Sequence, residues 1–485
     1  MIAPHRPAAE ALELLRAGRL AEAEHKALEA VAGARVCLPA HGLLALILFK
    51  QGKIEAAEHA VVTALGLSEG GGDAYDGLAF ISMQTGRHER ANALYRRAVE
   101  RAPADARLWY NLASSERTFG RLEEAAAACT RAIDLAATHY PSYLLRSELR
   151  VQTPDANHIA ELERQLTERR GDDRAQMFLG YAVAKELDDL GRYDEAFRWF
   201  AHAATTRRRH LAYDVALDER KFEQIAHAFS SSSDAPPDAA GESGRFVFII
   251  GLPRSGTTLL ERILTGLPGV ASNGETENFS RALLSAAPPM GGDVFERAAA
   301  ANPAAVGENY AQLAAHGGAE RVIEKMPLNY LYLGAIRRAL PDAKLILVKR
   351  APLDSCFAMY RTLFGAAYPF SYSFEDLARY YAAYQRLMDH WRRTLGAGLY
   401  EVSYEALVRA PAEVGAAVAA HCDIEWTDGA IHIQNNAAVS LTASAAQVRR
   451  PIYGSSSGRW RHYRRNLTPL ITALRERGVE VPPDA

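Results

Sequence analysis

The sequence predicts two folds in one chain: an all-α solenoid of repeated helix pairs, then an α/β domain whose parallel sheet is covered by helices on both faces. Three observations indicate this. The first half repeats every 34 residues, a polar stretch rich in Pro, Gly and Ser begins near residue 229, and strand–loop–helix units follow it. We expect the solenoid at 8–225 with about five to six helix pairs, a linker at 226–244, the α/β domain at 245–470 and a tail at 471–485.

Composition and charge are those of an ordinary soluble protein. The 485 residues are 48% hydrophobic and 24% charged, with a formal net charge of −2, so no global field favours nucleic acid or a membrane surface. The start of the chain lacks the long apolar segment of a signal peptide. No window is apolar for long enough to span a membrane. We therefore expect a cytoplasmic protein without nucleic-acid partners.

The four cysteines, Cys37, Cys129, Cys356 and Cys422, form no CxxC pair. Their spacing argues against a structural zinc site and against a disulfide framework. We expect four reduced thiols packed as small hydrophobic side chains.

Four glycines mark the repeat. Gly18, Gly52, Gly86 and Gly120 are each 34 residues apart, and each opens a similar phrase. Small or apolar residues recur five, nine and twelve positions after each glycine, which places them on one face of a helix. Glycine itself often ends a helix in a left-handed conformation. The residues at the three offsets are Ala23, Ala27 and Ala30; Ala57, Val61 and Ala64; Ala91, Tyr95 and Ala98; Ala125, Cys129 and Ala132.

This pattern resembles the tetratricopeptide repeat, in which each unit is a pair of antiparallel helices. A fifth copy follows Gly191, with Ala196, Phe200 and Ala203 at the same offsets. Gly191 lies 71 residues after Gly120, which is two periods plus three, so we expect a degenerate unit with a small insertion at about 140–175. Stacked helix pairs form a concave surface, which predicts binding of a protein or peptide. A rigid extension or a contact between two copies of the chain are the alternatives.

The sequence pattern changes after the segment FSSSSDAPPDAAGESG, whose residues are mostly small and polar, as is typical of linkers. Buried strands are predicted at RFVFIIGL, RVIEKMP, AKLILVKR and GLYEVSYEALV, which begin at Arg245, Arg321, Ala343 and Gly398. Helices are predicted at about 256–266, 328–340, 354–364 and 375–395. This alternation predicts a parallel sheet. Ligands of such sheets bind beyond the carboxyl ends of the strands.

The first of these strands ends in the loop GLPRSGTT. Gly251 and Gly256 have the spacing of a nucleotide-binding P-loop, but Thr257 and Thr258 stand where that motif has Lys followed by Ser or Thr. The loop amides and the helix N-terminus still form a cradle for an anion, and Arg254 adds a charged donor. The loop is therefore P-loop-like and predicts a phosphate-bearing ligand that needs no Mg²⁺.

The segment PRSGTTLLERIL resembles the 5′-phosphosulfate loop of sulfotransferases, which use PAPS as donor. The resemblance covers about 245–465 and is closest to tyrosylprotein sulfotransferases and to bacterial proteins that join tetratricopeptide repeats to a sulfotransferase domain. It implies PAPS as the donor, adenosine 3′,5′-bisphosphate as a product, and no metal. The loop residues that it assigns to the cofactor are Pro253, Arg254, Ser255, Gly256, Thr257 and Thr258.

The resemblance also implies catalytic roles. The spacing from the loop makes Glu275, in PGVASNGETENF, the base that takes the proton of the acceptor hydroxyl, and Glu277 is its rival. Turn residues around both acids predict a loop there. Lys325, in RVIEKMP, matches the lysine on the oxygen that bridges phosphate and sulfate, where a fixed ammonium stabilises developing charge. Arg254 would contact the equatorial oxygens of the sulfuryl group.

Further residues match the part of the family's site that holds the 3′-phosphate and the adenosine. Arg350, in LILVKRAPLDSCFAMY, matches the phosphate-binding arginine, and Tyr404 matches a tyrosine near the adenosine. The family usually has Ser eight residues after the arginine, where this chain has Ala358. Ser355 lies three residues earlier on a neighbouring part of the helical face, and we expect it to substitute.

The last matching segment is TASAAQVRRPIYGSSSGRWRHY. Alignment on Pro451 makes Ser444 the serine that stabilises the transferring sulfonate, and places Arg459 where the family has a cofactor-binding lysine. The phrase GSSSGRW, which includes Gly458 and Trp460, resembles the Gly-rich loop that folds over the 3′-phosphate.

Together these residues predict in-line transfer of a sulfuryl group from PAPS to an acceptor hydroxyl, with Glu275, Lys325, Arg254 and Ser444 as the catalytic set. The resemblance favours a protein tyrosine as acceptor, with a carbohydrate or small-molecule hydroxyl as the alternative. Two rival functions are a nucleotide-dependent kinase on the same fold, which the missing lysine opposes, and a repeat scaffold with an inactive transferase domain, which only Ala358 supports. The sequence leaves the oligomeric state open.

Overall fold

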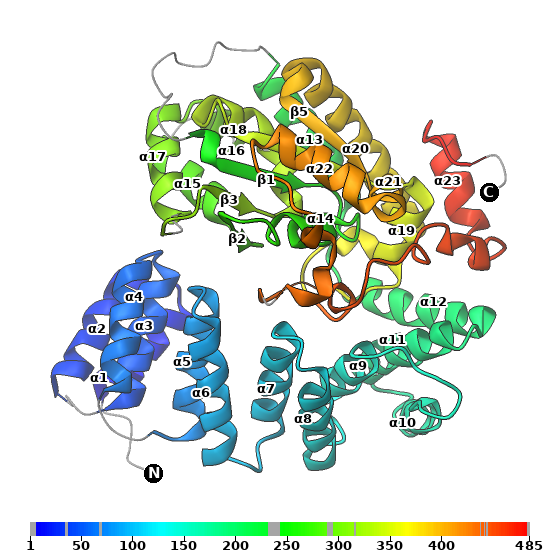
Figure 1. Ribbon diagram of the computed structural model, residues 1–485. Coiled ribbons are helices and arrows are strands. Elements are labelled where there is room, and N and C mark those ends of the chain that lie inside the picture. The colour runs from blue at the N-terminus through cyan, green and yellow to red at the C-terminus, as the bar shows by residue number, and fades with distance from the viewer. Residues whose placement is uncertain are drawn as a thin grey trace. The chain divides into compact units, whose positions relative to one another are not determined.

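The computed structural model describes residues 6–33, 37–66, 70–230, 243–288, 294–314, 317–436, 438–440, 442 and 445–482. The chain divides into two compact units, Met1–Arg150 and Val151–Ala485, and each is described by itself (Figure 1). Within these residue ranges, no helix is long and apolar enough to cross a membrane.

The first unit is built from helix pairs. Its helices are α1 (Arg6–Arg16), α2 (Leu20–Gly33), α3 (Leu38–Lys50), α4 (Ile54–Leu65), α5 (Gly72–Gln84), α6 (His88–Arg101), α7 (Ala106–Thr118), α8 (Leu122–Leu135) and α9 (Tyr140–Glu148). Each of the four repeat glycines lies between the two helices of one pair. Their φ angles are 74 to 79°, a left-handed conformation that favours glycine. The predicted helical face is confirmed, because all twelve residues at the three offsets are at most 7% exposed.

The repeat pattern continues in the second unit. Helices α10 (Ile159–Glu168), α11 (Asp173–Asp189), α12 (Tyr193–Arg209) and α13 (Val215–Ala228) precede the sheet. Gly191, between α11 and α12, has φ of 74°, and the residues at its three offsets are buried. The range predicted for the degenerate unit, about 140–175, contains α9 at the end of the first unit and α10 in the second, and an isolated β-bridge joins Thr153 and Ala156.

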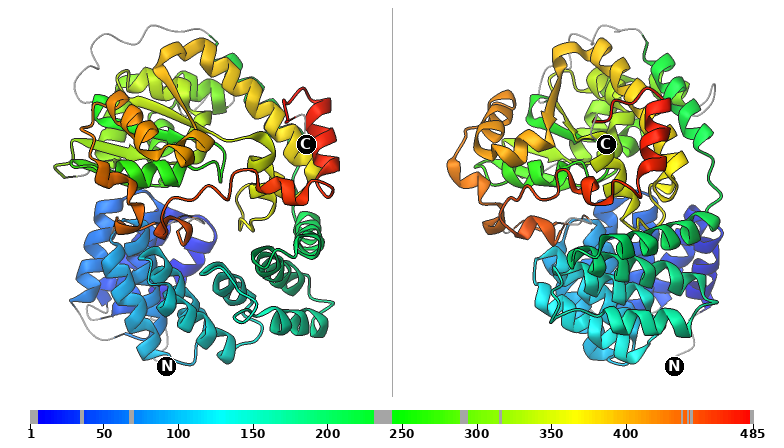
Figure 2. Two further views of the ribbon diagram at one scale, coloured as in Figure 1. Left: turned by 45° about the vertical axis from the view of Figure 1, so that its right-hand side comes forward. Right: turned by 90° about the vertical axis from the view of Figure 1, so that its right-hand side faces the viewer.

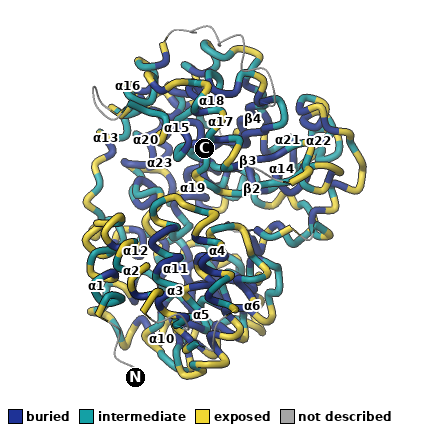
Figure 3. The backbone as a smooth tube through the Cα atoms, turned by 90° about the vertical axis from the view of Figure 1, so that its left-hand side faces the viewer, coloured by how far each residue is buried: buried dark blue, intermediate teal, exposed yellow. Residues whose placement is uncertain are grey.

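A parallel sheet forms the centre of the second unit. Over the part of the chain that the structure describes, it has five strands, β1 (Phe246–Ile250), β2 (Val270–Gly274), β3 (Arg321–Glu324), β4 (Lys344–Lys349) and β5 (Leu399–Ser403), in the order β2-β3-β1-β4-β5. The four predicted strands are confirmed. Most residues of β3 and β4 are buried (Figure 3). Strand β2 was not predicted, because its sequence VASNG has no apolar run and all five residues are half-buried. As the parallel partner of β3, it places its carboxyl end, and the acid that follows, at the same edge as the other strands.

Helices cover both faces of the sheet (Figures 1 and 2). Side chains alternate between the faces of a strand, and Val247 and Ile249 pack with α14 (Thr257–Leu264), α21 (Tyr404–Arg409) and α22 (Pro411–His421). On the other face, Phe248 contacts the rings of Phe279 in α15 (Asn278–Ala286) and Tyr310 in α17 (Pro303–Leu313). The other helices of this unit are α16 (Val294–Ala299), α18 (Leu333–Ala339), α19 (Pro352–Tyr360), α20 (Phe374–Leu395) and α23 (Thr468–Glu476). Short 3₁₀ helices lie at Ser243–Arg245, Pro327–Leu331, Pro369–Tyr372, Gly396–Gly398, Asp428–Ile431, Ile433–Asn435, Gln447–Arg449 and Arg459–Tyr463.

The four cysteines are free thiols. Cys129, Cys356 and Cys422 are buried, and Cys37 is half-buried. Burial raises the pKa of Cys129 and that of Cys422 to about 12. These two thiols therefore stay protonated at neutral pH and pack as small apolar side chains.

Candidate active site

The loop between β1 and α14 turns sharply at the carboxyl edge of the sheet. Gly256 has φ of 103°, and a Cβ at this position would lie 2.3 Å from the ring of Tyr404, so only glycine fits. Arg254 has φ of 66°, a conformation that is uncommon for a residue with a side chain. The Arg254 carbonyl accepts a hydrogen bond from Arg350 Nη1 at 2.8 Å. The arginine that follows β4 therefore fixes the backbone of the loop after β1.

Polar side chains of this loop and of the first turn of α14 are buried. Ser255, Thr257 and Thr258 are at most 6% exposed. Among the residues with described positions, the Ser255 hydroxyl meets no hydrogen-bond partner, while Thr258 Oγ1 lies 3.4 Å from Thr442 Oγ1. A buried hydroxyl that needs an acceptor, placed at the N-terminus of a helix, fits an anion.

Lys325 and Glu275 form an ion pair at the ends of β3 and β2. Lys325 is fully buried, and its Nζ lies 2.5 Å from Glu275 Oε1 and 3.6 Å from Glu261 Oε2. Glu275 is 32% exposed, so this carboxylate borders solvent while the lysine does not. The rival acid Glu277 is 65% exposed and lies 3.9 Å from Arg281. The structure thus brings Glu275, and not Glu277, to the lysine.

Glu261 is a site residue that the sequence reasoning missed. It lies on α14 and is 8% exposed, and its Oε1 accepts a hydrogen bond from Ser272 Oγ of β2 at 2.6 Å. An available signal was its position four residues after Thr257, because that spacing places both on one helical face.

Glu324, the residue before Lys325, is also fully buried. Burial raises the pKa of Glu324 to about 7, and a hydrogen bond from Asn329 opposes that rise. Asn329 Nδ2 donates to Glu324 Oε1 at 2.9 Å. This carboxyl therefore changes charge close to neutral pH.

A second cluster surrounds Arg350. Its guanidinium carbon lies 4.7 Å from the centre of the Tyr404 ring, and its Nη2 donates to the Ser456 carbonyl at 2.5 Å. The Tyr404 hydroxyl lies 2.5 Å from Ser456 Oγ, and the Gly458 amide donates to Asp354 Oδ2 at 2.7 Å. We call residues 454–463 the closing segment; it contacts Arg350 through Ser456 and Asp354 through Gly458. Burial lowers the pKa of Arg350, but an arginine side chain stays charged at neutral pH.

Helix α19 carries Ala358, at which this chain departs from the pattern expected for a 3′-phosphate site, and Ser355, which was expected to substitute. Ala358 is 9% exposed. Ser355 is 1% exposed, and its hydroxyl donates to the Arg350 carbonyl at 3.3 Å. The serine expected to substitute for the missing hydroxyl thus lies beside Arg350 and is bonded to its backbone.

The remaining predicted residues are spread more widely. Arg254 Nη2 donates to Gln447 Oε1 at 2.9 Å, and Trp460 is 2% exposed. The Arg459 guanidinium contacts Asp188, an acid at the end of α11 that the sequence reasoning did not identify. Ser444 lies outside the described residues.

The predicted residues come together strand by strand. The loop follows β1, Glu275 follows β2, Lys325 follows β3, Arg350 follows β4, and Tyr404 follows β5. Parallel strands end at one edge of the sheet, which is where ligands of open α/β sheets bind. This edge combines an anion cradle, a buried cation and a carboxylate that borders solvent.

Comparisons with known proteins agree with this arrangement. A family model described as sulfotransferase family matches residues 247–428. Tetratricopeptide-repeat models match residues 8–71, 82–140 and 183–214. The chain therefore carries tetratricopeptide repeats followed by a sulfotransferase-family domain, as the sequence predicted.

Individual relatives are distant. An uncharacterized protein of Aquifex aeolicus is 28% identical over 313 residues, which cover 61% of this chain and 41% of that protein. The sulfotransferase domain of the Synechococcus PCC 7002 olefin synthase is 20% identical, with a TM-score of 0.36, and the match covers 49% of this chain and 95% of that domain. A sulfotransferase from Alicyclobacillus acidocaldarius is 17% identical, with a TM-score of 0.28, over 48% of this chain and 96% of that structure.

Proposed function

We propose that the chain transfers a sulfuryl group from PAPS to an acceptor hydroxyl. The observation that carries the proposal is the meeting of the loop after β1 with Glu275 and Lys325 at one edge of the sheet. The sulfotransferase-family match over residues 247–428 supports the same class of reaction.

The residues present fit a donor with two phosphate groups. The buried Ser255 hydroxyl and the N-terminus of α14 suit one phosphate. Arg350 suits the other, because a guanidinium binds phosphate with paired donors. Bound there, PAPS would supply the sulfuryl group and a phosphate leaving group.

The ion pair suggests how the chain would act on an acceptor. Oε1 of Glu275 is bonded to Lys325, which leaves Oε2 to take the proton of an acceptor hydroxyl. The ammonium of Lys325 is buried, so it stabilises negative charge on a departing phosphate oxygen more strongly than it would in water. Arg254 and Ser444 would hold the equatorial oxygens.

We propose a tyrosine of a protein or peptide as the first acceptor to test. Tetratricopeptide repeats are matched over most of the first unit, and stacked repeats commonly bind protein segments. The hydroxyl of a carbohydrate or of a small molecule is the alternative.

Donor binding provides the first test. Adenosine 3′,5′-bisphosphate, titrated calorimetrically into the full chain without Mg²⁺, should bind, and Arg350→Ala should weaken that binding by at least about tenfold, or 1.4 kcal/mol. A preference for ATP with Mg²⁺ would replace the proposal with a kinase. An unchanged dissociation constant in Arg350→Ala would remove this arginine from the site.

Acceptor identity needs a separate assay. Labelled PAPS is incubated with a peptide library, a glycan set and a cell extract, and the products are read by mass spectrometry. We expect label on tyrosine-containing peptides. Label on glycans alone would move the acceptor to carbohydrate, and donor binding without transfer to any acceptor would favour an inactive transferase domain.

A further inference from the structure

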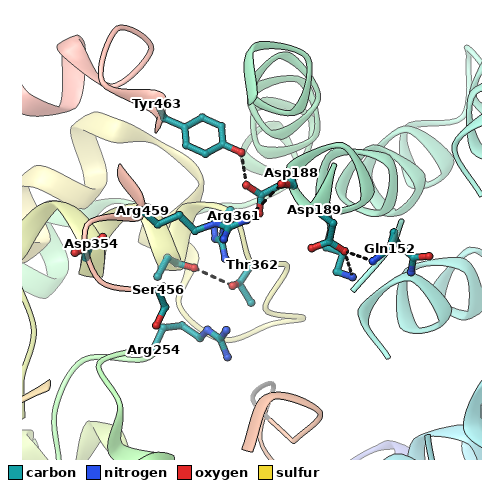
Figure 4. Close-up of polar contacts among 12 residues, drawn as sticks. Gln152, Asp188, Asp189, Arg254, Asp354, Arg361, Thr362, Ser456, Arg459 and Tyr463 are labelled. Atoms are coloured by element: carbon teal, nitrogen blue, oxygen red, sulfur yellow. Dashed lines mark hydrogen bonds and ion pairs between the residues drawn. The ribbon is translucent and has the colours of Figure 1, made fainter. Parts of the chain in front are cut away.

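Asp188, near the end of α11, is a buried carboxylate that holds three side chains from elsewhere in the second unit. It is 5% exposed, and its Oδ2 lies 2.8 Å from Arg361 Nη1 and 2.6 Å from Arg459 Nη2. Its Oδ1 accepts a hydrogen bond from the Tyr463 hydroxyl at 2.5 Å. Figure 4 shows these three side chains directed at Asp188. Although burial opposes ionisation, the two arginines lower the pKa of Asp188, so the cluster contains a true carboxylate.

The repeat pattern does not require an acid at this position. Asp188 lies three residues before the repeat glycine Gly191; the equivalent residue is Arg117 in the fourth copy, and in the first three copies the equivalent residues are Leu15, Phe49 and Met83. Those three side chains pack against the hydrophobic core of the repeats. A buried charge in place of an apolar side chain is costly unless it is paired. The requirement for Asp188 therefore comes from its partners and not from repeat packing.

The partners of Asp188 belong to the two segments that bring groups to Arg350. Arg361 follows α19, the helix that begins two residues after Arg350 and carries Asp354. Arg459 and Tyr463 belong to the closing segment, whose Ser456 carbonyl accepts from Arg350 and whose Gly458 amide donates to Asp354. One carboxylate thus joins the end of α19 to the end of the closing segment.

Helix α12 adds a second contact to the same segment. The ring of Tyr193 stacks on His462 at a centroid distance of 4.3 Å and meets the Tyr463 ring edge-on at 5.3 Å. The closing segment is therefore held by both helices of the last repeat, α11 through an ion pair and α12 through ring packing.

We propose that Asp188 is a positioning residue for donor binding: by holding Arg459 and Tyr463 against Arg361, it fixes the closing segment over Arg350. The last helix pair of the repeats then has a role in the transferase site that is separate from binding a partner. This inference rests on the proposed function, since it assigns the closing segment to the donor.

The chain offers a matched control in the next residue. Asp189 Oδ2 accepts from the Gln152 amide at 2.8 Å and from Lys185 Nζ at 2.6 Å, so its contacts stay within the helical part of the unit (Figure 4). Asp188→Asn and Asp189→Asn remove the same charge from adjacent positions. Only Asp188→Asn should weaken donor binding.

The test measures the dissociation constant of adenosine 3′,5′-bisphosphate and the hydrogen–deuterium exchange of residues 454–463 in the full chain. Asp188→Asn should weaken donor binding by at least about tenfold and speed exchange in this segment, while Asp189→Asn stays within about twofold of wild type. At saturating donor, kcat of Asp188→Asn should be largely kept, because a positioning role acts on the donor KM. Unchanged affinity and exchange in a folded Asp188→Asn protein would overturn the inference.

If Asp188→Asn fails to fold, Tyr463→Phe replaces it in the test, because the Tyr463 change removes one hydrogen bond and keeps the ring. It should weaken the donor by about threefold to fivefold and speed exchange in the same segment; wild-type values for both would overturn the inference. If wild type does not bind the nucleotide, the proposed function is contradicted. In that case, faster exchange in Asp188→Asn would still show that Asp188 holds the closing segment.

Discussion

The carboxylate of Glu275 lies 2.5 Å from the ammonium of Lys325 and is 32% exposed. Glu275→Gln keeps the shape of this side chain but cannot accept a proton, so turnover should fall by roughly 10²- to 10⁴-fold. The dissociation constant for adenosine 3′,5′-bisphosphate should change little. Turnover by labelled PAPS and calorimetric titration measure the two effects separately. Glu277→Gln is the control, and equal losses in both variants, or full turnover in Glu275→Gln, would contradict the assignment.

Glu324 predicts a pH dependence of stability. Its pKa is about 7 in the folded protein and 4.5 ordinarily, so the unfolded carboxyl ionises first as the pH rises. The free energy of unfolding therefore falls between about pH 4.5 and pH 7, by on the order of 3 kcal/mol. Glu324→Gln cannot ionise and should lack this decline. Urea unfolding of both proteins at pH 5 and pH 8 measures it, and an equal change in the two would contradict the role of Glu324.

At the scale of the elements, the turn from β1 into α14 depends on Gly256. A Cβ there meets the Tyr404 ring at 2.3 Å, and the φ of 103° is strained for any other residue. Gly256→Ala should lower the free energy of unfolding by about 1–3 kcal/mol and weaken binding of adenosine 3′,5′-bisphosphate. Gly429→Ala is the control, because nothing lies within 4 Å of an added Cβ there. Denaturant unfolding and titration compare them, and equal stability of the two variants would show that the turn adapts.

How far the sequence predicts an element depends on where its stabilising contacts lie. Strands β1, β3, β4 and β5 are apolar enough to be recognised from their own residues, and the candidate site residues follow strand ends or sit in motifs. Strand β2 has no such signal, because its pairing with β3 fixes it. The role of Asp188 could not be predicted from the neighbouring sequence, because its partner Arg459 is 271 positions away. Contacts of this kind arise only when two elements pack, and they include the residues that support the site.

At the scale of the whole molecule, the boundary between the two parts of the chain can be tested. The sequence places it at 226–244, whereas the compact unit with the sheet begins at Val151. Helices that precede the sheet form hydrogen bonds with residues that follow Ser243. Within the unit these bonds include Tyr181 to the Tyr360 carbonyl at 3.0 Å, Arg208 to Asp376 at 2.6 Å and Arg379 to Glu219 at 3.0 Å.

A chain that begins at Val151 should therefore unfold cooperatively and bind adenosine 3′,5′-bisphosphate with nearly the affinity of the full chain. A chain that begins at Ser243 loses α11, α12 and α13, which leaves Arg379 and the buried side chain of Asp376 without their partners. An uncompensated buried charge costs about 3–5 kcal/mol, so this shorter chain should be much less stable and should bind the nucleotide weakly. Thermal unfolding and titration of both chains decide the point. If the two behave alike, the transferase domain is independent of the repeats, and the boundary lies where the sequence places it.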